Sequence, residues 1–203
     1  MPKHSAIILA AGKGTRYQDT KQDVLFHGKS LWRYSYETAL RVLPMERIVV
    51  VGKDIPGGET RTESVMCGLR SIPTDTDRVI IIEAARPMVT DVQIRELLNS
   101  TSPSVSFVRP LVNTVVYRDG RFINRNELYD LLTPQAFDYS LLFEAYKSER
   151  FTDVTDDTRI MSEFHGIRPD FIETQNNLFK VTYPGDLDII ESIYKQQKEE
   201  TCI

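Results

Sequence analysis

The sequence predicts a three-layer α/β protein, with a mostly parallel, Rossmann-like sheet between two layers of helices. Four short apolar runs, at residues 5–10, 47–51, 78–82 and 104–108, alternate with segments of helical pattern. Continuous apolar runs of this length are typical of parallel strands that are buried on both faces. The segments between them then supply helices that cover each face of the sheet.

The helices between these strands have clear start signals. Residues 60–63 and 90–93 fit the capping box, in which a threonine side chain and a Glu or Gln three residues later bond to each other's backbone N–H groups. Pro184, followed by Asp186 and Asp188, opens the last helix, because proline suits the first helical turn and carboxylates favour that end of the helix dipole. These signals support the alternation of strands and helices.

The chain has 203 residues, of which 41% are hydrophobic, and this is enough to bury one full core. We expect a single domain over residues 1–203, from which residues 113–126 project as a β-arm. Within the arm, residues 115–123 predict a β-hairpin with a two-residue primed turn at Asp119 and Gly120. An isolated hairpin is only marginally stable, so we expect the arm to contact a second copy of the chain in a homodimer.

The stretch at residues 9–16, directly after the first strand, is the most informative part of the chain. Its glycines let the backbone approach phosphate oxygens, while Lys13, Arg16 and the nearby Lys21 supply cations at the same place. The sequence therefore predicts a triphosphate-binding site here. The alternative is an ordinary glycine-rich turn with solvated charges.

Two common phosphate-binding motifs do not fit this chain. The dinucleotide fingerprint needs a third glycine where Tyr17 stands, and an acidic residue at the end of the second strand, where the chain continues with Gly52 and Lys53. A P-loop that ends at residues 28–30 would need a glycine where Asp23 stands. We interpret residues 28–30 as a turn into a helix.

Composition excludes other classes of protein. The net charge of −4 and the sequence pI of about 5.5 speak against binding to nucleic acid or to a membrane surface, which needs a basic footprint. Cys67 and Cys202 are too few for a disulfide or metal framework, and no apolar run is long enough to span a membrane. No signal peptide precedes the first strand, so we expect a soluble, cytoplasmic protein. His4, His27 and His165 have no catalytic spacing.

Five segments of the chain match a known enzyme family in the same order. They are residues 10–16 with 21–22, 57–65, 84–87, 132–135 and 179–182. On these segments the chain resembles the cytidylyltransferases that activate polyol phosphates with CTP, namely methylerythritol phosphate cytidylyltransferase and its ribitol phosphate relatives. The resemblance implies a fold like that of the nucleotide-diphospho-sugar transferases, CTP and a small polyol phosphate as substrates, and Mg²⁺ as cofactor. By resemblance alone, 2-C-methyl-D-erythritol 4-phosphate is the leading acceptor.

Residue chemistry and the resemblance together indicate the site. The expected catalytic residues are Arg16 and Lys21, which hold the triphosphate, and Lys180, which the resemblance places beside the reacting phosphate. The expected nucleotide-binding residues are Ala10, Ala11, Gly12, Lys13, Gly14, Gly58, Glu59 and Ser64. Of these, the Gly58 backbone and the Ser64 hydroxyl suit the polar edge of cytosine, unless Ser64 only supports a helix start. By resemblance, the acceptor is bound, partly across the dimer, by Glu83, Arg86, Thr114, Arg125, Thr133 and Thr155, with Glu83 also a candidate Mg²⁺ ligand.

This chemistry explains why the chain has no nucleophile signature. In nucleotidyl transfer, an oxygen attacks the α-phosphorus of CTP while pyrophosphate leaves, so the site must neutralise growing negative charge. A phosphate monoester has its second pKa at about 6 and is already a nucleophile at neutral pH. The reaction therefore needs no general base and no His or Cys nucleophile.

The chain departs from the family pattern at three positions. Glu83 stands where the family has Asp, Thr20 where a Pro precedes the lysine, and Leu178 where an Asn is frequent. These departures keep two acceptor alternatives open, ribitol 5-phosphate or another polyol phosphate of cell-surface polymer synthesis, and a phosphonate. An alternative from another class is a nucleotide-binding regulator without turnover, although the charged residues expected at the site are all retained.

Overall fold

The computed structural model describes residues 2–12, 17, 23–174 and 178–201. Its α-helices are α1 Leu31–Leu40, α2 Arg61–Ser71, α3 Asp91–Asn99, α4 Tyr139–Lys147, α5 Asp157–His165 and α6 Asp186–Thr201. Its strands are β1 His4–Leu9, β2 Leu25–Phe26, β3 Lys29–Ser30, β4 Ile48–Val51, β5 Arg78–Glu83, β6 Ser104–Pro110, β7 Val115–Val116, β8 Phe122–Ile123, β9 Tyr129–Asp138 and β10 Asp170–Glu173. Short 3₁₀ helices lie at Met45–Arg47 and Arg125–Glu127.

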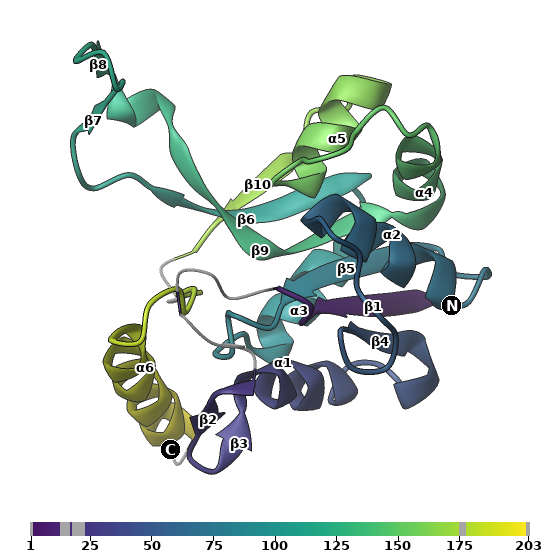
Figure 1. The fold of residues 1–203 in the computed structure, drawn as a ribbon, viewed down its shortest axis with the longest axis horizontal. Helices are drawn as coiled ribbons and strands as arrows, with labels where there is room; N and C mark the ends of the chain where they lie inside the picture. The colour runs from purple at the N-terminus through teal and green to yellow at the C-terminus, as the bar shows by residue number, and fades with distance from the viewer. Residues whose placement is uncertain (1, 13–16, 18–22, 175–177, 202–203) are drawn as a thin grey trace.

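The central sheet of the described chain has six strands in the order β10-β6-β9-β5-β1-β4 (Figure 1). Strand β1 pairs in parallel with β4 and β5, and β10 pairs in parallel with β6. Strand β9 is antiparallel to both β5 and β6, so the four strands predicted from apolar runs all point in one direction. The predicted mostly parallel sheet is confirmed, with β9 and β10 as additions that the sequence did not reveal.

Strand β9 carries an irregularity that matters for the site. Ser106 of β6 pairs with Gln135, whereas the next residue of β6 pairs with Leu132, so Thr133 and Pro134 form a bulge in β9. The peptide bond between these two residues is cis. Bulges often re-aim a side chain beside an active site, and here the bulge carries a predicted acceptor-binding residue, Thr133.

Each face of the sheet has its own hydrophobic core. Ile7 belongs to a buried cluster with residues of α2, α4 and α5, whereas its neighbour Ile8 belongs to a cluster with residues of α1 and α3. Neither isoleucine has any exposed surface. Helix α2 approaches β1 so closely that a Cβ on Gly68 would lie 2.5 Å from Ile7 Cγ2. The predicted three-layer arrangement is confirmed.

The predicted helix starts are confirmed as well. The Thr60 hydroxyl accepts a hydrogen bond from the Glu63 N–H at 3.1 Å, and the Glu63 carboxylate accepts one from the Thr60 N–H at 3.3 Å. Thr90 and Gln93 form the same capping box at the start of α3. The last helix, α6, begins at Asp186, so Pro184 lies two residues before it and not in its first turn. The Asp186 carboxylate accepts two backbone N–H bonds from the residues before the helix, at 2.6 and 2.8 Å.

Helix α6 packs beside the short β2–β3 hairpin and α1 (Figure 1). Leu31 of α1 and Ile190 of α6 belong to one buried cluster, and His27 Nε2 lies 2.6 Å from a carboxylate oxygen of Glu191. Residues 28–30 were predicted as a turn into a helix. Gly28 lies in the turn, but Lys29–Ser30 form strand β3, which pairs with β2 directly before α1. Among the helices described, none is both long and apolar enough to cross a membrane.

Strands β7 and β8 form a hairpin that projects far from the sheet (Figure 1). The predicted two-residue primed turn is wrong. The Tyr117 N–H donates to the Arg121 carbonyl at 2.8 Å and the Gly120 N–H donates to the Tyr117 carbonyl at 2.9 Å, which gives a three-residue loop at 118–120. Gly120 has a φ of 87° whereas Asp119 has no positive φ, because a type I turn followed by a left-handed glycine also fits the strand twist. The predicted protruding arm is confirmed.

Candidate active site

A cavity of about 330 Å³ opens at the carboxyl ends of β1 and β5. The residues that line it are Leu9, Ala11, Gly12, Gly58, Glu59, Thr60, Arg61, Ser64, Glu83, Ala84, Ala85 and Lys180. They come from the ends of these two strands, from the start of α2 and from the segment before α6. Ligands of open α/β sheets bind outside the carboxyl ends of the strands, so the cavity has the expected place for a binding site.

The segment after β1 forms one wall of the cavity. The Ala10 N–H donates to the Val51 carbonyl at 2.8 Å, and Ala10 is 2% exposed, so this residue supports the wall from beneath. Ala11 and Gly12 line the cavity directly, and a Cβ on Gly12 would meet nothing within 4 Å. The wall therefore has room beside Gly12 for a ligand. The other residues expected in this loop, Lys13, Gly14, Arg16 and Lys21, lie outside the described residues.

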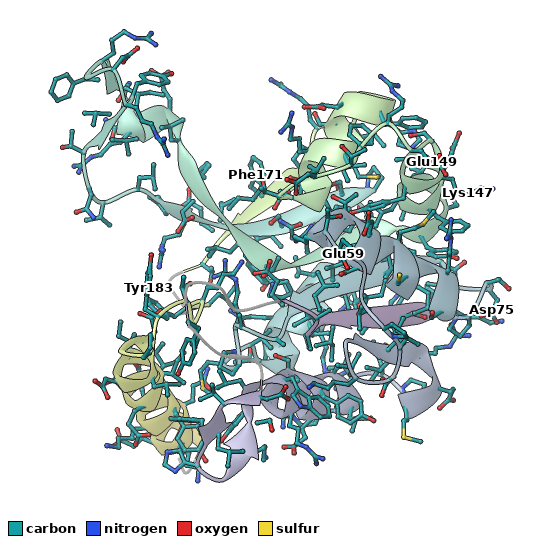
Figure 2. All side chains as sticks on the ribbon, in the orientation of Figure 1. Glu59, Asp75, Lys147, Glu149, Phe171 and Tyr183 are labelled. Atoms are coloured by element: carbon teal, nitrogen blue, oxygen red, sulfur yellow. The ribbon has the colours of Figure 1, made fainter. Side chains whose placement is uncertain are left out.

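The loop before α2 forms a second wall. A Cβ on Gly57 would lie 2.2 Å from the Ala11 Cβ, so a glycine is needed for the two walls to approach each other. The Gly58 N–H donates to Ser64 Oγ at 3.1 Å, and Ser64 Oγ donates to a backbone carbonyl at 2.9 Å. The Ser64 hydroxyl keeps one lone pair, which suits the amino group of cytosine. Glu59 lies two residues before α2 (Figure 2). It also lines the cavity.

Glu83, the last residue of β5, gathers the positive charges of the site. Its Oε2 lies 2.7 Å from Lys180 Nζ and 3.7 Å from Arg86 Nε, and its Oε1 lies 3.6 Å from Arg61 Nε. The side chain is 12% exposed. Burial by itself would raise the pKa of Glu83, but the attraction of the three cations, Lys180 above all, outweighs burial and lowers the pKa to about 2. The carboxylate is therefore ionised at neutral pH and carries no proton to transfer.

Arg61, the first residue of α2, lines the cavity and was not among the predicted site residues. Its guanidinium donates two hydrogen bonds to the Asp157 carboxylate, at 3.0 and 2.6 Å, and the Tyr146 hydroxyl donates to the same carboxylate. Burial lowers the pKa of Arg61, but the attraction of the fully buried Asp157 outweighs burial and keeps the pKa above its ordinary value. Burial and then Asp157 raise the pKa of Tyr146. The usable signal was the position of Arg61 inside the matched segment 57–65.

The segment that carries Lys180 docks along the end of β5. The Val181 N–H donates to the Ala85 carbonyl at 2.8 Å, and the Lys180 side chain, which is 35% exposed, lines the cavity. Leu178 is 2% exposed and belongs to the same core cluster as Ile8. This packing explains why an apolar residue suits position 178.

Arg86 connects this segment to the bulge of β9. Its guanidinium donates to the Thr133 hydroxyl at 2.9 Å and to the Leu178 carbonyl. The Thr133 hydroxyl in turn donates to Glu83 Oε2 at 3.3 Å. Burial lowers the pKa of Arg86. Arg86 and Thr133 thus reach the site through Glu83, although neither lines the cavity.

Three predicted acceptor-binding residues lie away from the cavity. Thr114 and Arg125 are exposed in the arm, and the Arg125 guanidinium donates to the carbonyl of Val112, just before the arm. Thr155 is exposed shortly before α5. Within one copy of the chain, the structure therefore gathers the described nucleotide-side residues and leaves these three acceptor-side residues outside the cavity.

The described residues do not fit a protein-held magnesium site. Among them, no group of three His, Cys, Asp or Glu side chains is placed to hold a metal ion. Glu83, the candidate ligand, has its Oε2 at 2.7 Å from the Lys180 ammonium and its Oε1 facing Arg61. A divalent cation on either oxygen would meet positive charge at short range, so Glu83 fits a partner of cations better than a magnesium ligand.

The chain is similar to known proteins along almost its whole length. A family model described as "IspD: 2-C-methyl-D-erythritol 4-phosphate cytidylyltransferase" matches residues 4–196. A 2-C-methyl-D-erythritol 4-phosphate cytidylyltransferase from Clostridium novyi (strain NT) is 31% identical, with 100% of both chains covered. A relative of the same name from Dechloromonas aromatica (strain RCB) is 32% identical, with 98% of this chain and 100% of the relative covered.

Solved structures share the fold. The bifunctional IspDF from Campylobacter jejuni matches with a TM-score of 0.80 at 25% identity and covers 92% of this chain, which spans 53% of that longer protein. The 2-C-methyl-D-erythritol 4-phosphate cytidylyltransferase from Thermus thermophilus matches with a TM-score of 0.78 at 24% identity, with 96% of this chain and 100% of that chain covered. On the family match and on the relatives that align over their full length, the chain belongs to the 2-C-methyl-D-erythritol 4-phosphate cytidylyltransferase family and is a nucleotidyltransferase.

Proposed function

We propose that this protein transfers the cytidylyl group of CTP to the phosphate of 2-C-methyl-D-erythritol 4-phosphate and releases pyrophosphate. The observation that carries the proposal is the cavity in which the glycine-rich end of β1, the start of α2 and Lys180 meet. The relatives that cover the chain from end to end carry this activity in their names. The cavity combines close backbone approach with cations, as a triphosphate requires.

The reaction is a displacement at the α-phosphorus of CTP. An oxygen of the acceptor phosphate forms the new P–O bond, the bond from the α-phosphorus to the bridging oxygen breaks, and pyrophosphate leaves with that electron pair. Lys180 and Arg61 line the cavity and neutralise negative charge as it grows on the phosphates. Arg61 Nε is buried and lies 3.6 Å from Glu83 Oε1, so the guanidinium acts on the phosphates through its charge. Arg16 and Lys21 add further cations in this proposal.

The start of α2 reads the base in this proposal. Ser64 Oγ already accepts from the Gly58 N–H and donates to a backbone carbonyl, so its free lone pair is an acceptor only. Cytosine presents an amino donor at the position where uracil presents a carbonyl acceptor. We therefore expect the loop to favour CTP over UTP.

We propose that Mg²⁺ reaches the site on the triphosphate of CTP. A magnesium ion commonly keeps several waters and binds substrate phosphates, and it would neutralise part of their charge. The described residues offer it no cluster of protein ligands. The proposed roles of Lys180, Arg61 and Ser64 depend on their own contacts and not on the metal.

We propose that a second copy of the chain completes the acceptor side of the site. Thr114 and Arg125 lie in the arm, where Phe122 and Val116 are 78% and 51% exposed. A two-stranded hairpin of this kind needs a partner surface to be stable. In a homodimer, the second copy would cover these apolar side chains of the arm. The arm would then bring Arg125, whose guanidinium can bind a phosphate in bidentate fashion, to the acceptor.

The release of pyrophosphate tests the proposal. The purified protein is assayed with CTP, UTP, ATP and GTP, each against 2-C-methyl-D-erythritol 4-phosphate, ribitol 5-phosphate and a polyol phosphonate. We expect turnover with CTP and 2-C-methyl-D-erythritol 4-phosphate, and a preference for CTP of about a hundredfold or more, because a wrong base leaves buried polar groups unpaired. Faster turnover with another acceptor or nucleotide would contradict the proposal, and CTP binding without any turnover would identify a regulator.

A further inference from the structure

Three cations from three parts of the chain share the carboxylate of Glu83. Arg61 begins α2, Arg86 follows β5, and Lys180 lies before α6. Lys180 Nζ is the close contact at 2.7 Å, whereas Nε of Arg61 and Nε of Arg86 lie at 3.6 and 3.7 Å. The carboxylate therefore pairs with the ammonium directly and is flanked by the two guanidinium groups.

The two arginines are held by other partners as well. Arg61 has its two hydrogen bonds to Asp157, and Arg86 donates to a hydroxyl and to a backbone carbonyl. Lys180, by contrast, carries its charge on a flexible four-carbon stem at the cavity wall. Within the described part of the chain, the ion pair that places its ammonium is the one with Glu83.

We propose that Glu83 is a positioning residue for Lys180, which holds the ammonium at the cavity wall of the free enzyme and directs it toward the phosphates of the bound nucleotide. This inference rests on the proposed function. An ammonium has three donors, so Lys180 can keep its bond to Glu83 and donate to a phosphate oxygen at the same time. Glu83 also offsets part of the positive charge of the cavity, and it thereby weakens the binding of CTP in the ground state.

The length of the Glu83 side chain allows its carboxylate to contact Lys180. Aspartate is one methylene shorter than glutamate, and its carboxylate would end farther from Nζ of Lys180 on the same backbone. The longer side chain instead spans from the end of β5 to Lys180 while its other oxygen faces Arg61. We therefore assign the length of the Glu83 side chain to the placement of the lysine.

The test compares Glu83→Gln and Glu83→Asp with the unchanged protein. The Gln variant removes the charge and keeps the shape, whereas the Asp variant keeps the charge and shortens the reach. The matched control is Glu96→Gln, which removes one negative charge from an exposed position of α3, far in sequence from the cavity residues. CTP affinity is measured by calorimetry, once with Mg²⁺ and once with a chelator, and kcat is measured by pyrophosphate release.

For Glu83→Gln we expect opposite changes in binding and turnover. The Kd for CTP should fall about threefold or more, because a charge that repels the phosphates is gone. The kcat should fall by about tenfold to a hundredfold, the scale for a misplaced catalytic group. Glu83→Asp should lose kcat with little change in Kd, and Glu96→Gln should change neither. If Glu83 had only a structural role, its replacement by Gln would weaken CTP binding and lower kcat together.

A double-mutant cycle shows whether Glu83 acts through Lys180. In the Lys180→Gln background, adding Glu83→Gln should change kcat less than about twofold, because the residue to be positioned is absent. Independent losses in the two variants would overturn the proposal. If the Gln variant fails to fold, as judged by circular dichroism, the Glu83→Asp variant and its cycle with Lys180→Gln decide the question.

Two further outcomes would also overturn the proposal. Weaker CTP binding by Glu83→Gln only in the presence of Mg²⁺ would identify Glu83 as a metal ligand, and unchanged kcat in both Glu83 variants would remove its positioning role. Failure of the proposed function is distinguishable from both. If the unchanged protein turns over no acceptor, that function is wrong, whereas the CTP affinities of the Glu83 variants still show whether the carboxylate offsets the charge of the cavity.

Discussion

At the scale of single residues, Asp157 carries a charge without any exposed surface, and both Arg61 and Tyr146 donate to it. Burying an ion costs several kcal/mol in lost hydration, and only a charged partner and hydrogen bonds can offset this cost. The pair with Asp157 therefore fixes Arg61 in one orientation at the cavity wall before any ligand binds. The same contacts stabilise the fold and preorganise the site.

Asp157→Asn should lower the free energy of unfolding by about 3 kcal/mol, because it leaves the Arg61 charge buried without its partner. It should also weaken CTP binding, since Arg61 lines the cavity. Urea unfolding followed by circular dichroism measures the first effect and calorimetry the second. The control is Glu163→Gln, which breaks the exposed pair with Arg159 on α5 and should cost less than about 0.5 kcal/mol. Equal losses in the two variants would contradict the role assigned to Asp157.

Glu83 makes the stability of the protein depend on pH in acid. Its pKa is about 2 in the folded protein, against an ordinary value of 4.5. Because the folded-state pKa is the lower one, the ionised carboxylate contributes stability above the ordinary pKa and loses that contribution as the pH falls toward 2. The contribution is about 3 kcal/mol at most. Urea unfolding at neutral pH and at about pH 3 should show a smaller acid loss in Glu83→Gln than in the unchanged protein. An identical acid loss in both would show that Glu83 is not the group responsible.

At the scale of elements, the site depends on the close approach of the loop after β1 and the loop before α2. Gly57→Ala should disturb this approach, because the new Cβ would lie 2.2 Å from the Ala11 Cβ. We expect a loss of about 1–3 kcal/mol in stability, as for overpacking, together with a higher KM for CTP. The control is Gly185→Ala, whose Cβ would meet nothing within 4 Å. Thermal unfolding and initial rates check both, and an unchanged KM in Gly57→Ala would separate this contact from nucleotide binding.

The predictable elements are those whose environment marks the local sequence. Strands β1, β4, β5 and β6 lie inside the sheet or against helices, so burial requires continuous apolar runs. Strand β9 is also inside the sheet but has no continuous apolar run, because two of its residues are polar and hydrogen-bonded. The Thr133 hydroxyl accepts from Arg86, and the buried Gln135 donates to Asp156. Strand β10 is an edge strand with mostly exposed side chains, among them Phe171 (Figure 2). Neither strand leaves an apolar run that identifies it.

The residues of the site also divide into those that their local sequence marks and those that it does not. Gly12, Gly58 and Lys180 follow from motifs in their own segments, and the structure places all three at one cavity. The partnership of Arg61 with Asp157 joins residues 96 positions apart, and no local pattern records such a pairing. The type of the hairpin turn could not be predicted from the sequence either. Asp-Gly occurs both in a primed two-residue turn and in a type I turn followed by a left-handed glycine.

At the scale of the whole molecule, the sheet and the arm have different tasks. The sheet collects the ends of β1 and β5, the start of α2 and the Lys180 segment at one edge (Figure 1). The arm extends Thr114 and Arg125 away from that cavity together with exposed apolar side chains. One copy of the chain thus holds the nucleotide side of the proposed site, and the acceptor side depends on what the arm contacts.

Replacing residues 115–123 with a short Gly-Ser linker should therefore separate the two substrates. We expect the variant to sediment as a monomer and to bind CTP with a Kd within about twofold of the unchanged protein, because the residues that line the cavity come from the sheet edge, α2 and the Lys180 segment. The KM for the acceptor should rise by about tenfold or more, since a bidentate contact from the arm to a phosphate is lost.

Arg125→Lys should raise the same KM in a protein that stays dimeric, because a point charge does not reproduce the guanidinium fork. Sedimentation velocity, CTP calorimetry and acceptor kinetics measure the three quantities, with Asp119→Asn at the exposed tip of the arm as the control that keeps both strands. A linker variant that remains dimeric with an unchanged acceptor KM would show that the arm serves neither the dimer nor the acceptor.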